Sequence, residues 1–99
     1  MDIQIIGKNI EVTQSLHDYV SCKINHAIKH FNQVDKIIVS LFIENEQHTV
    51  EVNLSIENKN IHCKTSENNL YESLDIISEK IKTILHKHKE KKQLIKHIN

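Results

Sequence analysis

Residues 48–56 read HTVEVNLSI and carry the clearest pattern in this chain of 99 residues. Apolar side chains alternate there with polar ones, the apolar ones being Val50, Val52, Leu54 and Ile56. Successive side chains of a β-strand point to opposite faces of a sheet, so the alternation predicts a strand that is buried on one face and wet on the other. The fold must therefore supply a second layer that covers only one face of the sheet.

Three further segments predict strands around this one. Residues 37–43 (IIVSLFI) are rich in β-branched side chains and too short for an ordinary helix. Residues 60–65 (NIHCKT) follow a turn at ENKN and place Ile61 and Cys63 inward. Residues 2–6 (DIQII) form a short first strand that ends at Gly7. The sequence therefore predicts four strands.

Two segments with apolar residues three and four apart predict helices that each bury one stripe. The first runs from residue 14 to 31 after Thr13, a good N-cap, and leaves Cys22 opposite its stripe, facing water. The second covers 70–85 (LYESLDIISEKIKTIL). The stripes are Leu16, Val20, Ile24, Ala27, Ile28 and Phe31 in the first helix, and Leu70, Leu74, Ile77, Ile81, Ile84 and Leu85 in the second.

The order β-α-β-β-β-α restricts the topology. A strand, a helix and a second strand normally form a right-handed parallel unit, while strands joined by short turns pair antiparallel. Each helix has one apolar stripe, so both helices are expected on the same face of the sheet. The prediction is an α+β fold: a two-layer sandwich with a four-stranded mixed sheet and two helices packed on one face. Residues 1–95 are expected to form a single domain, and residues 96–99 a short tail.

The charges are balanced in number but separated along the chain. Residues 1–79 hold 6 lysines and 12 acids, whereas residues 80–99 hold 7 lysines and 1 acid. At about 100° per residue, Lys80, Lys87 and Lys91 follow one flank of the second apolar stripe, and Lys82 and Lys89 follow the other. Such rows suit a phosphate backbone, which they would bind without reading its base sequence. A solvated helix end favoured by the helix dipole is the alternative, although seven lysines exceed what the dipole requires.

Several classes of protein lack support in the sequence. Two cysteines are too few for a disulfide framework and predict reduced thiols. No apolar run reaches the roughly 18–20 residues of a membrane span, and no signal peptide is recognisable. These features predict a cytoplasmic protein without a membrane partner. No GxSxG, P-loop, HExxH or CxxC motif is present, so neither an enzyme, a cofactor nor a small-molecule substrate is expected.

Two other features of the sequence are candidate sites. His26 and His30 stand four residues apart on the first helix, a spacing that binds zinc when a third ligand joins, but the sequence identifies none; His86 and His88 point in different directions. A metal site is therefore not expected. The open face of the sheet is expected to be solvated, because a single Phe42 beside glutamates is a poor platform for RNA bases. Its predicted members are Gln4, Ile6, Ile38, Ser40, Phe42, Glu44, Glu51, Asn53, Ser55, His62 and Lys64.

Short segments spread along the chain resemble one family. They are IIGKNIEVT, HFNQV, the pair His48-Thr49, IHCKT, NLYESLDIISEKI and KHKEK. In this order, from Ile3 to Lys92, they are similar to the ribosome hibernation promoting factor family. That family includes the ribosome-associated inhibitor and the sigma-54 modulation proteins. The resemblance implies the same fold. It also implies binding to the small ribosomal subunit and its ribosomal RNA, in the channel that messenger RNA and the A-site and P-site transfer RNAs use. Translation is then blocked in stationary phase or stress.

The resemblance also implies a subtype and a set of RNA-binding residues, which are the positions of this chain that match the family. The length is that of the short form, which acts with a separate ribosome modulation factor to promote or stabilise inactive dimeric ribosomes. Tyr71 and Asp75 match family positions as well, whereas Phe42 and Asn45 stand where some relatives have lysine. Two alternatives remain open: a ribosome-associated inhibitor that silences single ribosomes, and a protein-interaction module that uses the open sheet face. The RNA-binding residues implied by the resemblance are Lys8, Lys23, Lys80, Lys82, Lys87, Lys89, Lys91 and Lys92.

Overall fold

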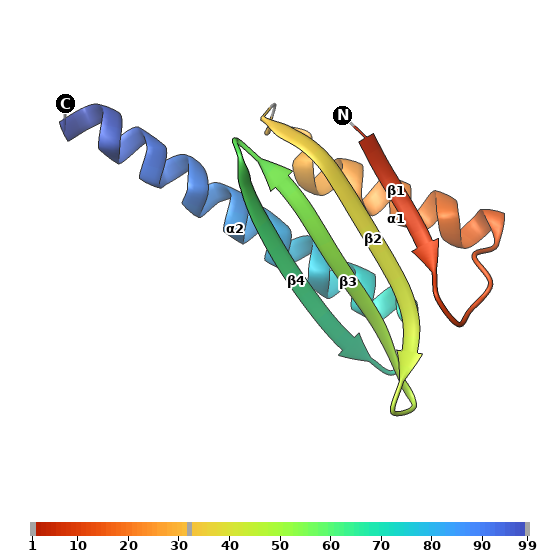
Figure 1. Cartoon of the computed structure of the whole chain (residues 1–99). Helices are drawn as coiled ribbons and strands as arrows, with labels where there is room; N and C mark the ends of the chain where they lie inside the picture. The colour runs from red at the N-terminus through yellow and green to blue at the C-terminus, as the bar shows by residue number, and fades with distance from the viewer. Residues whose placement is uncertain (1, 32, 99) are drawn as a thin grey trace.

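The computed structural model has the predicted order of elements (Figure 1). It describes the backbone of residues 2–31 and 33–98, and the side chains of residues 3–31 and 33–90. The elements are β1 (Asp2–Gly7), α1 (Gln14–Ile28), β2 (Val34–Glu44), β3 (Gln47–Ile56), β4 (Lys59–Glu67) and α2 (Leu70–Ile98).

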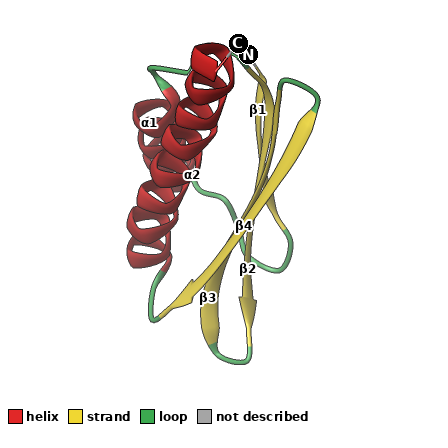
Figure 2. Cartoon of the chain, turned by 90° about the vertical axis from the view of Figure 1, so that its left-hand side faces the viewer, coloured by secondary structure: helices red, strands yellow, loops and turns green. Residues whose placement is uncertain are grey.

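The four strands form one mixed sheet in the order β1-β2-β3-β4. Strands β1 and β2 are parallel, and the other two pairs are antiparallel hairpins. Figure 2 shows both helices on the same face of this sheet. The predicted α+β two-layer sandwich is therefore confirmed, because each element has only one apolar side to bury.

The core lies between the helices and the covered face of the sheet. Val50, Val52, Leu54 and Ile56 of β3 are at most 2% exposed, which confirms the alternation that predicted this strand. Opposite them lie the stripes of both helices, of which Leu74, Ile77, Ile81 and Leu85 of α2 are fully buried. Each such side chain contributes roughly 1.5–3 kcal/mol by leaving water. Cys63 is buried and Cys22 is exposed, as expected.

Some boundaries differ from the predicted ones. The strands are longer, and α1 ends at Ile28, so Phe31 is buried from the loop instead of from the helix. Its backbone N–H donates to the Ile28 carbonyl at 2.9 Å, which turns the chain after the helix. The spacing that marks a helical stripe does not reveal that a residue keeps its place in the core after the helix has ended. Ser40, predicted on the wet face, is only 5% exposed.

Both hairpins turn without glycine. The turn residues Asn45 and Glu46 have φ values of 52° and 64°, and Glu57 and Asn58 have 47° and 66°. Positive φ at both central positions is required by the type I′ turn, which matches the twist of antiparallel strands. Asparagine tolerates this backbone region better than glutamate does.

The only glycine, Gly7, lies where the chain folds back on itself after β1. A Cβ there would be 2.6 Å from the Ile10 carbonyl oxygen and 2.7 Å from Cγ2 of Val12. The loop from β1 to α1 can follow this close path because residue 7 has no side chain.

Replacing Glu46 by glycine is expected to stabilise the fold by about 0.5–1 kcal/mol, because glycine adopts a positive φ without steric cost. The free energy of unfolding in urea measures the change. The comparison variant Asn53→Gly introduces glycine at an exposed position inside β3 and should destabilise the fold, since strand interiors disfavour glycine. Equal effects of the two variants would contradict the turn assignment.

Candidate nucleic-acid interface

Helix α2 continues beyond the core that holds its first half. Leu85 is the last fully buried residue among those whose side chains the structure describes, and the backbone remains helical to Ile98. Figure 1 shows the final turns projecting past the sheet. Exposed residues follow Leu85, among them Lys87 and Lys89. His88, between these lysines, is only 17% exposed and lies 3.5 Å from Glu57 in the turn between β3 and β4, so the helix still touches the end of the sheet there while Lys87 and Lys89 point to solvent.

Lys87 and Lys89 make no hydrogen bond or ion pair with any residue whose side chain the structure describes. Their ammonium groups can thus reach a partner without breaking such a contact. Lys91 and Lys92 belong to the same predicted set, but their side chains lie outside the described residues.

Lys82 lies on the side of α2 that faces α1. It lines a hollow of about 300 Å³ between the two helices, the interhelical groove, whose members are His26, Ala27, Lys29, His30, Phe31, Lys82 and His86. The Lys82 ammonium also pairs with Glu79 at 3.2 Å. His86, predicted to point outward, is exposed but sets its ring edge-on against Phe31, with centroids 5.3 Å apart.

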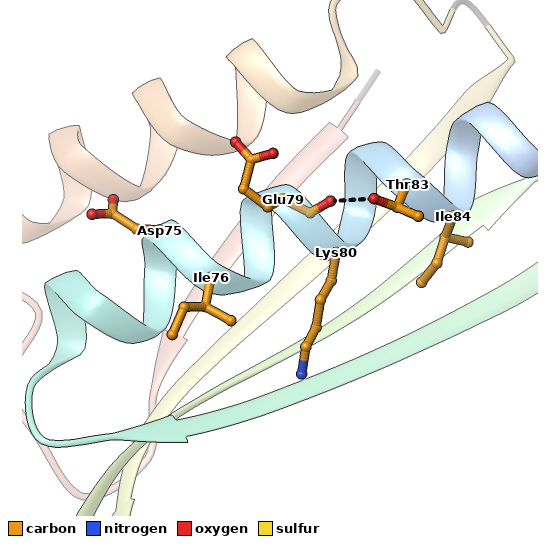
Figure 3. A pocket seen from close by; sticks show the side chains of 6 residues that line it. All are labelled: Asp75, Ile76, Glu79, Lys80, Thr83 and Ile84. Atoms are coloured by element: carbon orange, nitrogen blue, oxygen red, sulfur yellow. Dashed lines mark hydrogen bonds between the residues drawn. The ribbon is translucent and has the colours of Figure 1, made fainter.

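Lys80 extends along the opposite flank. Figure 3 shows it pointing toward β4, away from Asp75 and Glu79. Its ammonium donates to Thr65 Oγ1 at 3.0 Å and, over 3.5 Å, to the Lys64 carbonyl, with Ile76 and Ile84 before and after it in a shallow apolar hollow. A lysine over a free sheet edge discourages pairing with another strand. The prediction that Lys80 and Lys82 lie on different flanks is confirmed.

Lys23 of α1 is held by a small network that joins the helices. Its ammonium lies 3.0 Å from the Asp75 carboxylate of α2, and the Tyr19 hydroxyl donates to the same oxygen at 2.7 Å. These two hydrogen bonds keep the pKa of Asp75 below its usual value, while the carboxylate raises the pKa of Tyr19. The Tyr71 ring packs edge-on against Tyr19, with centroids 4.8 Å apart, so Tyr71 and Asp75 both connect the helices.

Lys8 lies on the open face of the sheet. Its ammonium is 3.8 Å from Glu51 and 4.9 Å from the centre of the Phe42 ring, and Lys64 lies 5.7 Å from the same ring. Phe42 therefore has two basic neighbours that the sequence did not reveal. Both lysines are paired, because Lys64 meets Glu44 at 3.1 Å. Glu51 also contacts His62 at 2.6 Å, a hydrogen bond that lowers the pKa of Glu51.

The predicted lysines thus occupy separate surfaces. Lys82, Lys87 and Lys89 lie on the helical layer and its extension, Lys80 covers the edge of β4, and Lys8 lies on the open face.

The family model described as "Sigma 54 modulation protein / S30EA ribosomal protein" matches residues 3–93. The chain belongs to this family.

Relatives of this S30EA family member carry names that refer to the ribosome. A "Ribosome hibernation promotion factor" of Picosynechococcus sp. is 39% identical over 92% of this chain, which spans 50% of that longer protein. A "Ribosome hibernation promoting factor" of Pseudomonas putida is 33% identical over 94% of this chain and 91% of its own length. A ribosomal subunit interface protein of Coxiella burnetii has the same fold, with a TM-score of 0.85 and 20% identity over 91% of this chain and 99% of its own.

The structure also bears on metal and membrane sites. His86 joins His26 and His30 around the interhelical groove, yet the described part of the chain holds no group of three or more His, Cys, Asp or Glu side chains placed to bind a metal ion. Among the described helices, none combines the length and the apolar character that crossing a membrane requires.

Removing the Asp75 carboxylate should lower the pKa of Tyr19 toward its ordinary value of about 10, since the carboxylate holds the phenol proton. Asp75→Ala is made in a Tyr71→Phe background, which leaves Tyr19 as the only tyrosine of the two. Tyrosinate absorbance during an alkaline titration reports the pKa. Asp18→Ala removes a charge next to Tyr19 in sequence and should change it far less; similar shifts in both variants would show that the hydrogen bond to Asp75 is not the cause.

Proposed function

We propose that this protein is a non-enzymatic ribosome hibernation factor of the cytoplasm. It binds the small ribosomal subunit in the channel of messenger RNA and the A-site and P-site transfer RNAs, and it blocks translation by occupying that space. Residues 1–95 act as a single ribosome-binding domain, followed by the short tail 96–99. The observation that carries the proposal is the exposure of Lys87 and Lys89 on the two flanks of α2, beyond its last fully buried described residue, Leu85.

Contacts between ammonium groups and phosphates supply the affinity. Lys87 and Lys89 have no described partner, so an RNA backbone gains their charge without first breaking an ion pair. Each contact releases condensed counterions and carries no base information. This suits a factor that must fit one place on the ribosome by shape and not by sequence.

The remaining predicted lysines contribute in different ways. Lys82 and Lys23 lie on the helical layer, where they form ion pairs with Glu79 and Asp75. They can bind RNA only if these ion pairs break or if the phosphate joins them. Lys91 and Lys92 extend the row in sequence. Lys8 and Lys80 are directed at the other face and at the sheet edge, and we assign them to contacts outside the main RNA surface.

The names of the relatives support the hibernation role, because they describe hibernation factors and a ribosomal subunit interface protein. We further propose that the protein promotes or stabilises inactive dimeric ribosomes together with a ribosome modulation factor. The alternative is an inhibitor that silences single ribosomes. Sedimentation of ribosomes from stationary cells with and without this protein separates the two, since only the first shifts ribosomes into dimers.

Replacing both Lys87 and Lys89 by glutamate should weaken binding to isolated small subunits by at least tenfold at about 0.1 M salt, because two phosphate contacts become repulsive. Cosedimentation over a series of salt concentrations measures the affinity. The slope of log affinity against log salt should fall by about 1.4 to 1.8 in magnitude, or roughly 0.7–0.9 for each lost contact.

Lys36→Glu combined with Lys59→Glu is the matched control, with the same change of net charge on β2 and at the start of β4. This control should retain most of the affinity. Equal losses in the two double variants would mean that net charge alone governs binding, and an unchanged affinity of the Lys87/Lys89 variant would refute the proposed RNA surface. Affinity that hardly depends on salt would favour an apolar protein contact instead.

A further inference from the structure

The interhelical groove gathers titratable bases from two helices. His26 lies in the last turn of α1, His30 in the turn that follows this helix, and His86 on α2. Lys29 and Lys82 line the same hollow. The sequence separates His86 from the other two histidines by more than half the chain, so only the fold brings the three together.

The groove has no carboxylate among its lining residues. The nearest acid along α2 is Glu79, which pairs with Lys82, and Asp75 is engaged by Lys23 and Tyr19 further along the helices. Glu90 follows His86 by one turn and does not line the groove, and the sheet contributes no lining residue. Protonation of the three imidazoles would therefore add up to three positive charges beside Lys29 and Lys82, and among these described side chains only Lys82 has a carboxylate partner, Glu79 at 3.2 Å.

Like charges held together destabilise one another unless an anion joins them. Imidazole side chains ordinarily gain their proton near pH 6.5. By linkage, an anion in the groove favours protonation, and protonation strengthens binding of the anion by the same factor. The groove is therefore suited to an anion whose own charge does not change in this pH range.

We propose that the interhelical groove is a proton-dependent binding site for a phosphodiester group of ribosomal RNA, which strengthens ribosome binding as the cell interior becomes acidic. The inference rests on the proposed function and adds to it a chemical signal that regulates affinity.

Continuity with the lysines of α2 favours RNA over a free anion. Lys82, His86 and Lys89 follow one another at intervals of four and three residues, so they share one face of the helix. The row covers about 10 Å of helix at roughly 1.5 Å per residue. It joins the groove to the exposed end of α2, so a single strand of RNA can pass along both surfaces.

The test compares binding to small subunits at about pH 7.5 and about pH 6.0, on either side of the ordinary histidine range. Cosedimentation is carried out at constant ionic strength. The natural protein should bind about tenfold more tightly at the lower pH, consistent with two to three added cations near phosphate. The triple variant His26→Gln, His30→Gln and His86→Gln should bind equally at both pH values and should match the natural protein at the higher one.

His17→Gln combined with His62→Gln is the control, because these exposed histidines lie elsewhere, on the first turns of α1 and on the sheet. This control should keep the full pH dependence. Circular dichroism verifies that each variant is folded at both pH values. A pH effect that survives in the triple variant, or that disappears in the control, would overturn the assignment of the groove.

A second measurement works without ribosomes and separates the two proposals. Sulfate, which keeps its charge across this range, should shift the NMR ring resonances of His26, His30 and His86 at the lower pH only, and leave those of His17 and His62 in place. Absence of that shift overturns the groove site. If sulfate binds in the groove but the protein does not bind small subunits, the proposed function is overturned. The groove would then be an anion site with a role unrelated to the ribosome. Ribosome binding that is equal at both pH values would overturn only the inference drawn here.

Discussion

The extent of the sheet determines what each half of α2 can do. The strands that it crosses have 10 and 9 residues, whereas the helix has 29. A helix satisfies its backbone hydrogen bonds internally, so it can continue after the sheet beneath it has ended. From Leu74 to Leu85 the helix buries an apolar stripe; beyond Leu85, His88 still contacts Glu57 in the turn between β3 and β4, while Lys87 and Lys89 are exposed. One continuous element thus anchors the domain and carries its charge outward.

Four lysines in the body of the domain are paired with carboxylates. Lys8, Lys23, Lys64 and Lys82 are each within 4 Å of a carboxylate. Exposed ion pairs of this kind add little to stability. Their consequence is electrostatic: residues 1–79 hold 12 acids and 6 lysines, whereas residues 80–99 hold 7 lysines and 1 acid, so the excess of positive charge lies on α2. This separation is what would let a formally neutral protein attract a polyanion through one region, as the proposed function requires.

Local patterns predicted what depends on local geometry. The alternation in residues 48–56 defined a strand, and the helical spacing of Lys80 and Lys82 placed them on opposite flanks, because both inferences follow from the repeat of one element. The sequence could not show which flank meets β4 and which meets α1. It also missed the pairing of Lys23 with Asp75, and the convergence of Lys8 and Lys64 on Phe42. These contacts join residues from different elements and depend on how those elements pack.

The turns show the same limit at a smaller scale. Asn45 is a residue that favours positive φ, but Glu46 and Glu57 are not, and their backbone is imposed by the register of the hairpins. Packing of the covered face of β3 against the helices fixes its register with β2 and with β4, since a slip of one residue would turn its buried side chains to water. The strands therefore determine the turns here, and a reading based on glycine and proline would have found neither.

The helical end of α2 is a better carrier of lysines than a flexible tail would be. Lys87 and Lys91 stand four residues apart in sequence, and such like charges cost the helix a few tenths of a kcal/mol per pair. Cations near the C-terminus interact favourably with the helix dipole by a similar amount, so the segment stays helical but gains nothing from its lysines on its own. A polyanion along the flank removes the repulsion. Because the helix already fixes the backbone between the lysines, binding restricts few additional rotatable bonds. The loss of conformational entropy on binding is therefore smaller than it would be for a flexible tail. In the proposed function, the unfavourable charge density of the free protein would therefore be a source of its affinity for RNA.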